Sequence, residues 1–227
     1  MSKSTVSRRL LEEKLESYAP ATKPLLTSEQ KARRLEWCLE RRFWTLQIWK
    51  SVIFSDESNF EVLNRKSAQY VRRFQHEKYD ERFVVKKVQG GGGSVGMWGC
   101  ISVNGAGCCE LYSGRLSAED YQTVLANALL PSIDLLVEDR EELLFQQDNA
   151  PCHSARSTTA WLAEHDINTL PWPSRSPDLN PIEHIWDLLD RKLTAVNPNN
   201  HTELESRLKT FWNEISPDLC AKLVESM

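Results

Sequence analysis

Short apolar runs bounded by turn residues alternate with amphipathic segments along most of the chain. Runs of this kind predict strands at 52–56, 95–103, 108–114, 142–148 and 167–172, and a hairpin partner for the first at 60–63. Helical spacing predicts helices over 4–17, 28–42, 117–136, 154–165 and 182–194, and one or two more within 202–226. Since most strands come first, most helices later, and crossovers join the strands, the fold class is mixed α/β.

Turn-forming and polar stretches divide this pattern. Residues 18–27 contain Pro20 and Pro24 and indicate a linker. The main domain is expected to begin near Trp44, after the helix over 28–42. Ser28 is expected to cap the following helix, whose apolar face would hold Ala32, Leu35 and Leu39. Residues 64–89 are polar and basic, and Gly90–Gly93 indicate a flexible connection. Pro131 predicts an interruption of the helix over 117–136.

Charge is distributed unevenly. The net charge is −4, but residues 1–50 carry 11 Lys and Arg against 6 Asp and Glu, while the rest carries 17 against 26. A basic arm thus precedes an acidic body, which can still handle DNA if its carboxylates hold divalent metal. No apolar run reaches the length of a membrane span, and the charged N-terminus is no secretory signal. Six cysteines without a C-x-x-C pair argue against zinc and favour a reducing intracellular compartment.

Two aspartates each follow a predicted buried strand. Asp56 ends the run VIFSD, and Asp148 ends the run ELLFQQD. If these strands are neighbours in the sheet, both carboxylates converge on one point at the carboxyl ends of the strands. The alternative is that both are turn residues, because Ser-Asp and Asp-Asn pairs also favour turns.

A third carboxylate, Glu183, lies at a predicted helix start. Asn180, Pro181 and Glu183 fit the N-cap, first and third positions, so Glu183 could simply cap its own helix. It falls off the apolar stripe of that helix, however, and could equally face the strand ends. Three carboxylates suit Mg2+, which prefers oxygen ligands and supports phosphodiester chemistry. The sequence has no phosphate-binding loop, nucleophile elbow or H-E-x-x-H motif that would favour another chemistry.

Four ordered blocks resemble the signature blocks of Tc/mariner transposases, most closely those of the Tc-type branch. They are FSDES (54–58), GGGSVGMWGCIS (91–102), FQQDNAPCH (145–153) and WPSRSPDLNPIEHIW (172–186). The resemblance implies a ribonuclease-H-like fold and a DDE triad formed by Asp56, Asp148 and Glu183, with the family's 34-residue spacing between the last two. It also implies Mg2+ as the cofactor, with Mn2+ able to substitute, and cut-and-paste cleavage and strand transfer into TA targets.

The same resemblance implies the organisation and partners of the chain. Residues 1–20 would be the remnant of a helix-turn-helix DNA-binding module, 21–43 a basic linker with a helix, and 44–227 the catalytic domain. Double-stranded DNA would be the partner, bound by a homodimer in the nucleus, with no membrane involved. The candidate DNA contacts are Arg8, Arg9, Lys23, Lys31, Arg33, Arg34 and His153. A structural hydrogen bond is the alternative for His153, and an exposed position is expected for His184. The alternative function is a domesticated, non-catalytic DNA-associated or interaction module.

Overall fold

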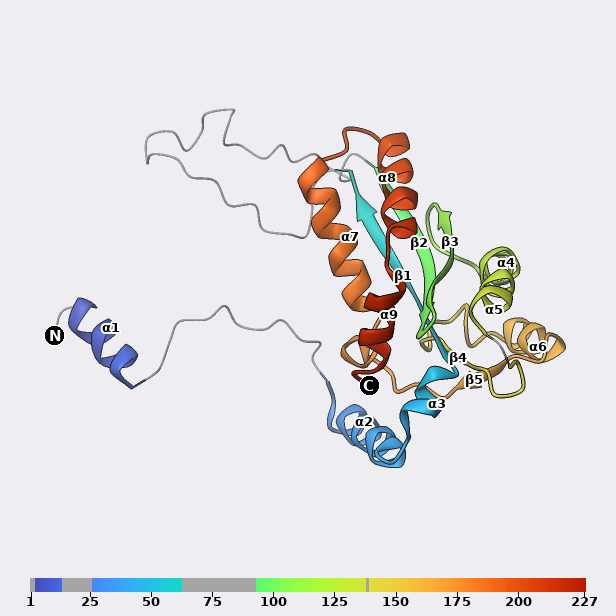
Figure 1. The fold of residues 1–227 in the computed structure, drawn as a ribbon, viewed down its shortest axis with the longest axis horizontal. Helices are drawn as coiled ribbons and strands as arrows, with labels where there is room; N and C mark the ends of the chain where they lie inside the picture. Colours follow the sequence, from blue (N-terminus) through green and yellow to red (C-terminus); the bar gives the residue numbers. More distant parts are fainter. Residues whose placement is uncertain (1–2, 14–25, 63–92, 138) are drawn as a thin grey trace.

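A five-stranded mixed sheet forms the centre of the computed structural model, which describes residues 3–13, 26–62, 93–137 and 139–227 (Figure 1). The spatial order is β3-β2-β1-β4-β5. Its strands are β1 (Val52–Glu61), β2 (Ser94–Ser102), β3 (Gly105–Tyr112), β4 (Leu144–Gln146) and β5 (Asn168–Leu170). The first three pair antiparallel, and β1, β4 and β5 pair parallel. The expected mixed α/β class is confirmed, while the expectations for 64–89 and for a flexible Gly90–Gly92 lie outside the described residues.

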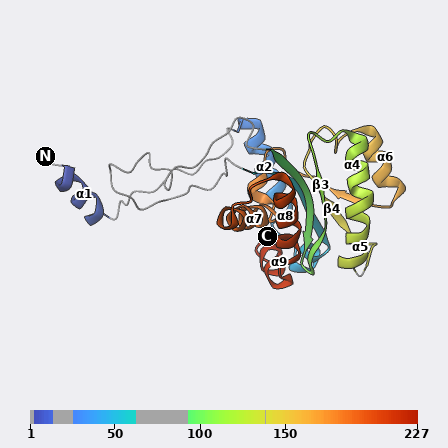
Figure 2. The ribbon, with the colours of Figure 1, turned by 90° about the horizontal axis from the view of Figure 1, so that it is seen from above.

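Helices cover both faces of this sheet, as Figure 2 shows. One face carries α7 (Glu183–Val196), α8 (His201–Asn213) and α9 (Pro217–Val224), and the other carries α4 (Ala118–Val124), α5 (Leu130–Leu136) and α6 (Arg156–Glu164). Successive strand residues point to opposite faces. Phe54 therefore joins the apolar cluster on the α7 side, and Ile53 joins the cluster on the α4 side. By the same alternation, Asp56 faces α7 and Glu57 faces α4.

Strand β1 differs from the sequence-based expectation. The hairpin expected between 52–56 and 60–63 is wrong, because Val52–Glu61 form one strand. Ser58 and Asn59, which lie between the two expected strands, instead continue β1 and pair with Met97 and Gly96 of β2. This long antiparallel pairing satisfies the backbone groups of β1 beyond the end of β4. Asp56 consequently lies in the middle of a strand rather than at its end.

Two local features follow from single residues, and the expected interruption near Pro131 is confirmed. A turn at Val103 and Asn104 joins β2 to β3, and Gly105, the first residue of β3, has a φ of 138° that favours glycine. The helix over 117–136 is interrupted before Pro131 by the π-helical turn Leu125–Leu129. Pro131 has no N–H and its ring crowds the carbonyl four residues earlier, so the regular α-helical bonding changes there.

The N-terminal helices are α1 (Lys3–Glu12), α2 (Ser28–Arg41) and α3 (Leu46–Lys50), the last of which the sequence pattern did not predict. Thr27, not Ser28, caps α2. The face predicted to be apolar is wrong, because Leu35 and Leu39 are 61% and 50% exposed, whereas Trp37 is buried. An indole buries more apolar area than leucine and also offers an N–H, and the Trp37 N–H bonds the carbonyl of Pro171.

Two further observations concern the lengths of the helices and the cysteines. Among the described residues, no helix combines the length and apolar character needed to cross a bilayer. All six cysteines fall within the described segments, and all carry free thiols.

Candidate active site

The pairing of β1 with β4 brings Asp56 and Asp148 to the same level of the sheet. Phe54 and Gln146 form the last parallel pair, so each aspartate lies two residues beyond it. Ser55 locks this junction: its N–H donates to Gln146 Oε1 at 3.1 Å, and its hydroxyl donates to the Gln146 carbonyl at 2.8 Å. The convergence expected for neighbouring strands is therefore present, although only Asp148 follows a strand end.

The start of α7 is attached to the same point of β1. The side-chain amide of Asn180 donates to the carbonyl of Ser55 at 3.0 Å, and the Asn180 carbonyl accepts the N–H of Glu183 at 3.2 Å. Asn180 is buried, but it does not serve as the predicted N-cap, a position that Ile182 holds without a side-chain cap bond. The buried Asn180 thus carries Glu183 to β1, next to Asp56.

Asp56, Asp148 and Glu183 all line one cavity of about 400 Å3. Residues of the loop between β5 and α7 form much of the remaining wall; the rest of the lining is Asn149, Ala150, Trp172, Pro173, Ser174, Arg175, Ser176, Pro177 and Asn180. Within the described segments, no three His, Cys, Asp or Glu side chains are already gathered as a metal-binding cluster. The three carboxylates share a cavity without closing on one another.

The surroundings of Asp56 disfavour its charged form. Burial, together with repulsion from Glu57, Glu183 and Asp148, raises the pKa of Asp56 to about 8. The indole N–H of Trp186 donates to Asp56 Oδ2 at 3.3 Å, which stabilises the carboxylate but does not neutralise it.

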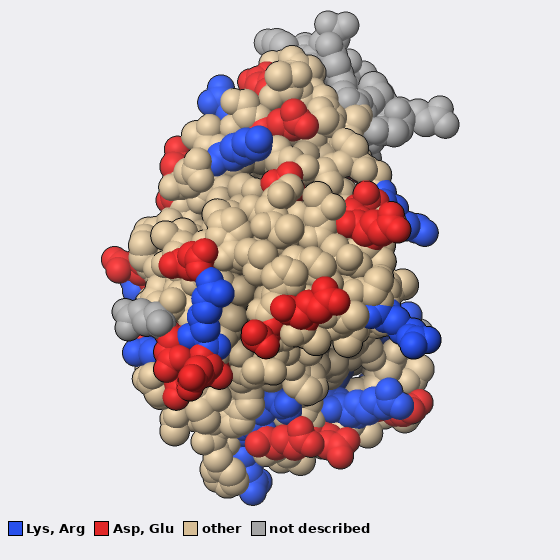
Figure 3. Space-filling model, turned by 90° about the vertical axis from the view of Figure 1, so that its right-hand side faces the viewer, with Lys and Arg blue, Asp and Glu red and all other residues tan. Residues whose placement is uncertain are grey.

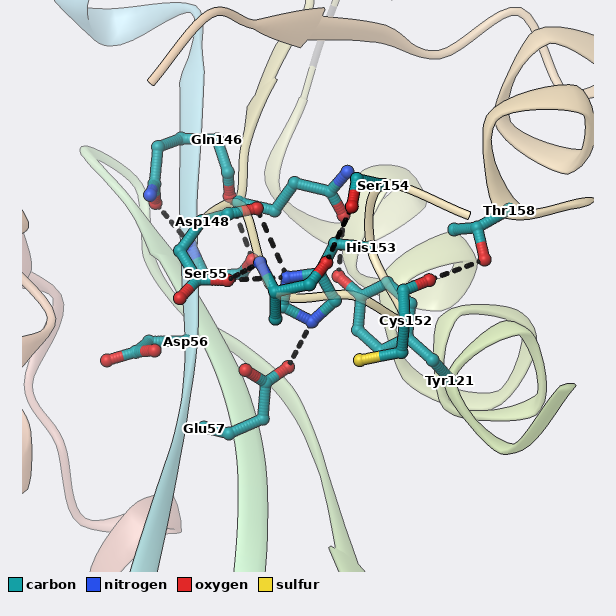
Figure 4. Close-up of polar contacts among 12 residues, drawn as sticks. Ser55, Asp56, Glu57, Tyr121, Gln146, Asp148, Cys152, His153, Ser154 and Thr158 are labelled. Atoms are coloured by element: carbon teal, nitrogen blue, oxygen red, sulfur yellow. Dashed lines mark hydrogen bonds and ion pairs between the residues drawn. The ribbon is translucent and has the colours of Figure 1, made fainter. Parts of the chain in front are cut away.

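Asp148 is held by its own loop. It accepts the N–H of Ala150 at 2.8 Å and lies 2.8 Å from Nδ1 of His153 (Figure 4). These bonds outweigh the effect of burial and lower the pKa of Asp148. The turn that the alternative interpretation predicted is thus real, and the same side chain also lines the cavity.

His153 joins Asp148 to a residue that the sequence analysis missed. Its Nε2 lies 3.2 Å from Oε1 of Glu57, and its ring packs against that of Tyr121, tilted by 33° with 4.0 Å between centroids. Burial alone would lower the pKa of His153, but the two carboxylates raise it to about 10, so the ring is a buried cation. His153 is 3% exposed, and its ring contacts Asp148, Glu57 and Tyr121, as the structural alternative expected; its contact with DNA stays a prediction. Alternation along β1 is the signal that would have placed Glu57 opposite Asp56.

The other candidate DNA contacts are distributed differently. Arg8, Arg9, Lys31 and Arg33 are exposed, and Lys23 lies outside the described residues. Arg34 is only 17% exposed and is bonded to Asp178. On the face seen in Figure 3, basic and acidic side chains are interspersed, without a single basic patch. His184 is exposed, as expected.

Comparison with known proteins identifies the family. A family model described as DDE superfamily endonuclease matches residues 51–205, and one described as transposase matches residues 1–42. The Tcb1 transposase of Caenorhabditis briggsae and the Tc1 transposase of Caenorhabditis elegans are 34% and 32% identical over 226 residues, covering 100% of this chain and 82% of each relative. The chain therefore belongs to the DDE endonucleases and, within them, to the Tc-type transposases.

Solved structures agree with this fold. A pre-cleavage Mos1 transpososome matches with a TM-score of 0.79 at 19% identity, over 99% of this chain and 67% of that one. The catalytic domain of Mos1 mariner transposase matches with a TM-score of 0.68 at 18% identity, over 91% and 92% of the two chains. The fold is thus the ribonuclease-H-like fold that the resemblance implied, and the chain is a DDE transposase.

Proposed function

We propose that Asp56, Asp148 and Glu183 form the catalytic centre of this transposase and hold divalent metal. The observation that carries the proposal is their meeting on one cavity, from a strand, a loop and a helix start that lie far apart in sequence. Mos1 paired-end complexes have been solved with Mg and with Mn, which supports Mg2+ as the cofactor here and Mn2+ as its substitute. The substrate we assign is the phosphodiester bond at transposon ends. Its cleavage would be followed by transfer of the cut strand to TA targets.

Each residue has a distinct task in this proposal. Asp56 would be held rigidly by the sheet and by Trp186, while Asp148 would be fixed by Ala150 and by His153. Glu183 would approach from the opposite wall. When bound, a pair of divalent cations activates the attacking oxygen and stabilises the leaving oxygen of a phosphodiester. The chain's own part is to position three carboxylates, so the reaction needs no nucleophilic side chain.

A nicking assay tests this function. We expect the chain to nick supercoiled plasmid DNA with Mn2+ and to lose that activity with EDTA. Asp148→Asn should abolish nicking, because it removes a negative charge from the cavity. Asp134→Asn is the control, since Asp134 is exposed on α5, on the face of the sheet covered by α4–α6. Equal activity of wild type and Asp148→Asn would refute the assignment.

We further propose double-stranded DNA as the partner, bound by a homodimer, and the nucleus as the location. The match of residues 1–42 to a transposase family model and the likeness to paired-end complexes support the first two. The location follows from the substrate, because chromosomal DNA is nuclear in organisms such as those of the matched relatives. Light scattering with and without DNA, and imaging of a fluorescent fusion, test these assignments. The family match and the shared cavity argue against the non-catalytic module.

A further inference from the structure

Arg34 on α2 binds the loop between β5 and α7, which lines the cavity of the three carboxylates. Its guanidinium donates to both carboxylate oxygens of Asp178, at 2.8 and 2.6 Å, and to the carbonyl of Arg175 at 3.1 Å. A two-bond arginine–carboxylate contact fixes direction as well as distance. The Arg34 side chain is 17% exposed and its partner Asp178 is 53% exposed, whereas the neighbouring Arg33 is 66% exposed.

A second contact from the same helix holds the beginning of this loop. Trp37 donates its indole N–H to the Pro171 carbonyl at 2.6 Å and packs edge-on against Trp172, with ring centroids 4.9 Å apart. Trp172 and Arg175 both line the cavity that contains the three carboxylates. Helix α2 thus contacts the wall at 171–172 and again at 175–178.

The backbone of the wall shows why it needs this support. Arg175 has a φ of 55°, a left-handed conformation that non-glycine residues rarely adopt. It persists where surrounding contacts enforce it, and the carbonyl of Arg175 is one of the groups that Arg34 binds. Beyond Asp178 the chain reaches Asn180, which is bonded to β1, and then Glu183. The wall therefore leads directly into the residues that place Glu183 beside Asp56, and a displaced wall would strain the bond between Asn180 and β1.

We propose that Arg34 is a positioning residue of the catalytic centre: it clamps the wall 171–178 and thereby fixes Glu183 opposite Asp56 and Asp148. The inference rests on the proposed metal-binding function of these three carboxylates. It assigns α2, which lies in the basic segment expected to be a linker, to the structural support of the active site. Arg34 is consequently excluded from the surface that contacts DNA, while Arg33 remains available.

Mn2+ binding and hydrogen exchange test this role in the full chain. We expect Arg34→Gln to weaken Mn2+ binding, measured by the electron paramagnetic resonance of free Mn2+, by roughly tenfold, as for other residues that orient metal ligands. Arg34→Lys should recover only part of the affinity, because one ammonium cannot span both oxygens of Asp178 and the Arg175 carbonyl. Arg33→Gln is the matched control and should leave Mn2+ affinity unchanged.

Hydrogen exchange separates positioning from general destabilisation. Arg34→Gln should speed exchange in peptides covering 171–181 and leave that of β1 and β2 unchanged. Faster exchange throughout the sheet, or unchanged exchange at 171–181, would overturn the proposal. Asp178→Asn approaches the same clamp from the loop, so it serves if Arg34→Gln fails to fold. Combining the two should weaken Mn2+ binding no more than Arg34→Gln alone, and additive effects would contradict the clamp.

Asp148→Asn distinguishes a failure of this proposal from a failure of the proposed metal-binding function on which it rests. If wild type binds Mn2+ and Asp148→Asn does not, the metal site stands. Unchanged Mn2+ affinity in Arg34→Gln would then refute the clamp alone. If Asp148→Asn binds Mn2+ as wild type does, the proposed function itself fails.

Discussion

At the scale of single residues, β1 places one carboxylate on each face of the sheet. Asp56 faces α7, and burial, together with repulsion from Glu57, Glu183 and Asp148, raises its pKa to about 8. Glu57, the next residue, faces α4 and meets the buried His153. One face therefore brings three carboxylates to a cavity that a cation can enter, while the carboxylate on the other face is paired with His153 within the protein. This division supports the proposed metal-binding role of Asp56 and a structural role for Glu57.

The test at Glu183 separates chemistry from helix capping. Glu183→Gln keeps the shape of the side chain, so the free energy of unfolding should change by less than about 1 kcal/mol. The loss of charge should slow Mn2+-dependent nicking by on the order of a thousandfold, a barrier increase of several kcal/mol. Asp187→Asn, one turn further along α7 and exposed, is the control and should leave nicking nearly intact. The reverse ordering would show that the third ligand has been placed one turn too early.

Replacing His153 tests its role as a buried cation. His153→Ala leaves Asp148 and Glu57 facing each other without the charge between them, so the free energy of unfolding should fall by about 2 kcal/mol. This figure allows for the 55% exposure of the Asp148 side chain, which water screens. Urea denaturation provides the measurement, with His184→Ala as an exposed control that should change stability by less than about 0.5 kcal/mol. Adding Glu57→Gln to His153→Ala should recover part of the stability, and a further decrease would argue against the ion pair.

At the scale of elements, the positions of most helices and strands could be predicted from the sequence, but the residues that each element buries could be predicted less well. The strands at 95–103 and 108–114 and the helix at 182–194 were predictable because each carries a periodic apolar pattern between turn residues. The continuity of β1 was not, because Ser58 and Asn59 favour a turn locally and only pairing with β2 overrides that preference. The buried face of α2 escaped prediction for a similar reason: periodicity counted the leucines, but the contact partner selected Trp37.

The candidate site shows the same limit. Asp56, Asp148 and Glu183 were predictable from strand ends, a helix start and the family blocks. Their supporting contacts were not, because Asn180 bonds to Ser55 across 125 positions and Arg34 bonds to Asp178 across 144. Local patterns contain no information about such pairs. These contacts depend on how elements pack, and the packing is visible only in three dimensions.

The packing of β2 against α8 lies next to the site and can be tested at Gly99. Gly99 pairs with Asp56, and a Cβ added there would lie 2.3 Å from the ring of Trp212. Trp212 cannot withdraw easily, since its N–H bonds the Gly107 carbonyl at 2.8 Å and its ring packs 5.5 Å from that of Trp186. We expect Gly99→Ala to reduce the free energy of unfolding by about 1–3 kcal/mol in urea denaturation. It should also weaken Mn2+ binding, because Trp186 donates to Asp56.

A second substitution checks the cause of that destabilisation. In Gly99→Ala/Trp212→Phe the smaller ring leaves room for the new methyl group, so the double variant should be less destabilised than the sum of the two single variants. Strict additivity would mean that the alanine acts elsewhere, for example through the backbone of β2.

At the scale of the whole molecule, charge is separated between the two ends of the sequence. Residues 1–50 carry an excess of five positive charges and the remainder an excess of nine negative charges. DNA is therefore expected to engage the N-terminal arm through its exposed cations and to reach the acidic cavity only together with divalent metal. Binding that depends on phosphate contacts releases counterions, so its affinity falls steeply with salt concentration.

The last prediction follows from which arginines are free to bind phosphate. Binding of this chain to DNA should be weak, with little sequence preference, and its slope of log affinity against log salt should become shallower by about 0.9 for each phosphate that a variant no longer neutralises. Arg8→Gln and Arg33→Gln should each reduce this slope, since both side chains are exposed on helix surfaces and only paired with a glutamate one turn away. Arg34→Gln should leave the slope unchanged, because its guanidinium is occupied by Asp178. Fluorescence anisotropy across a salt series, with duplexes of unrelated sequence, provides the measurement. Equal effects of Arg33→Gln and Arg34→Gln on the slope would show that Arg34 leaves the cavity wall to bind DNA. Tight binding to one sequence alone would show that the N-terminal arm contacts bases as well as phosphates.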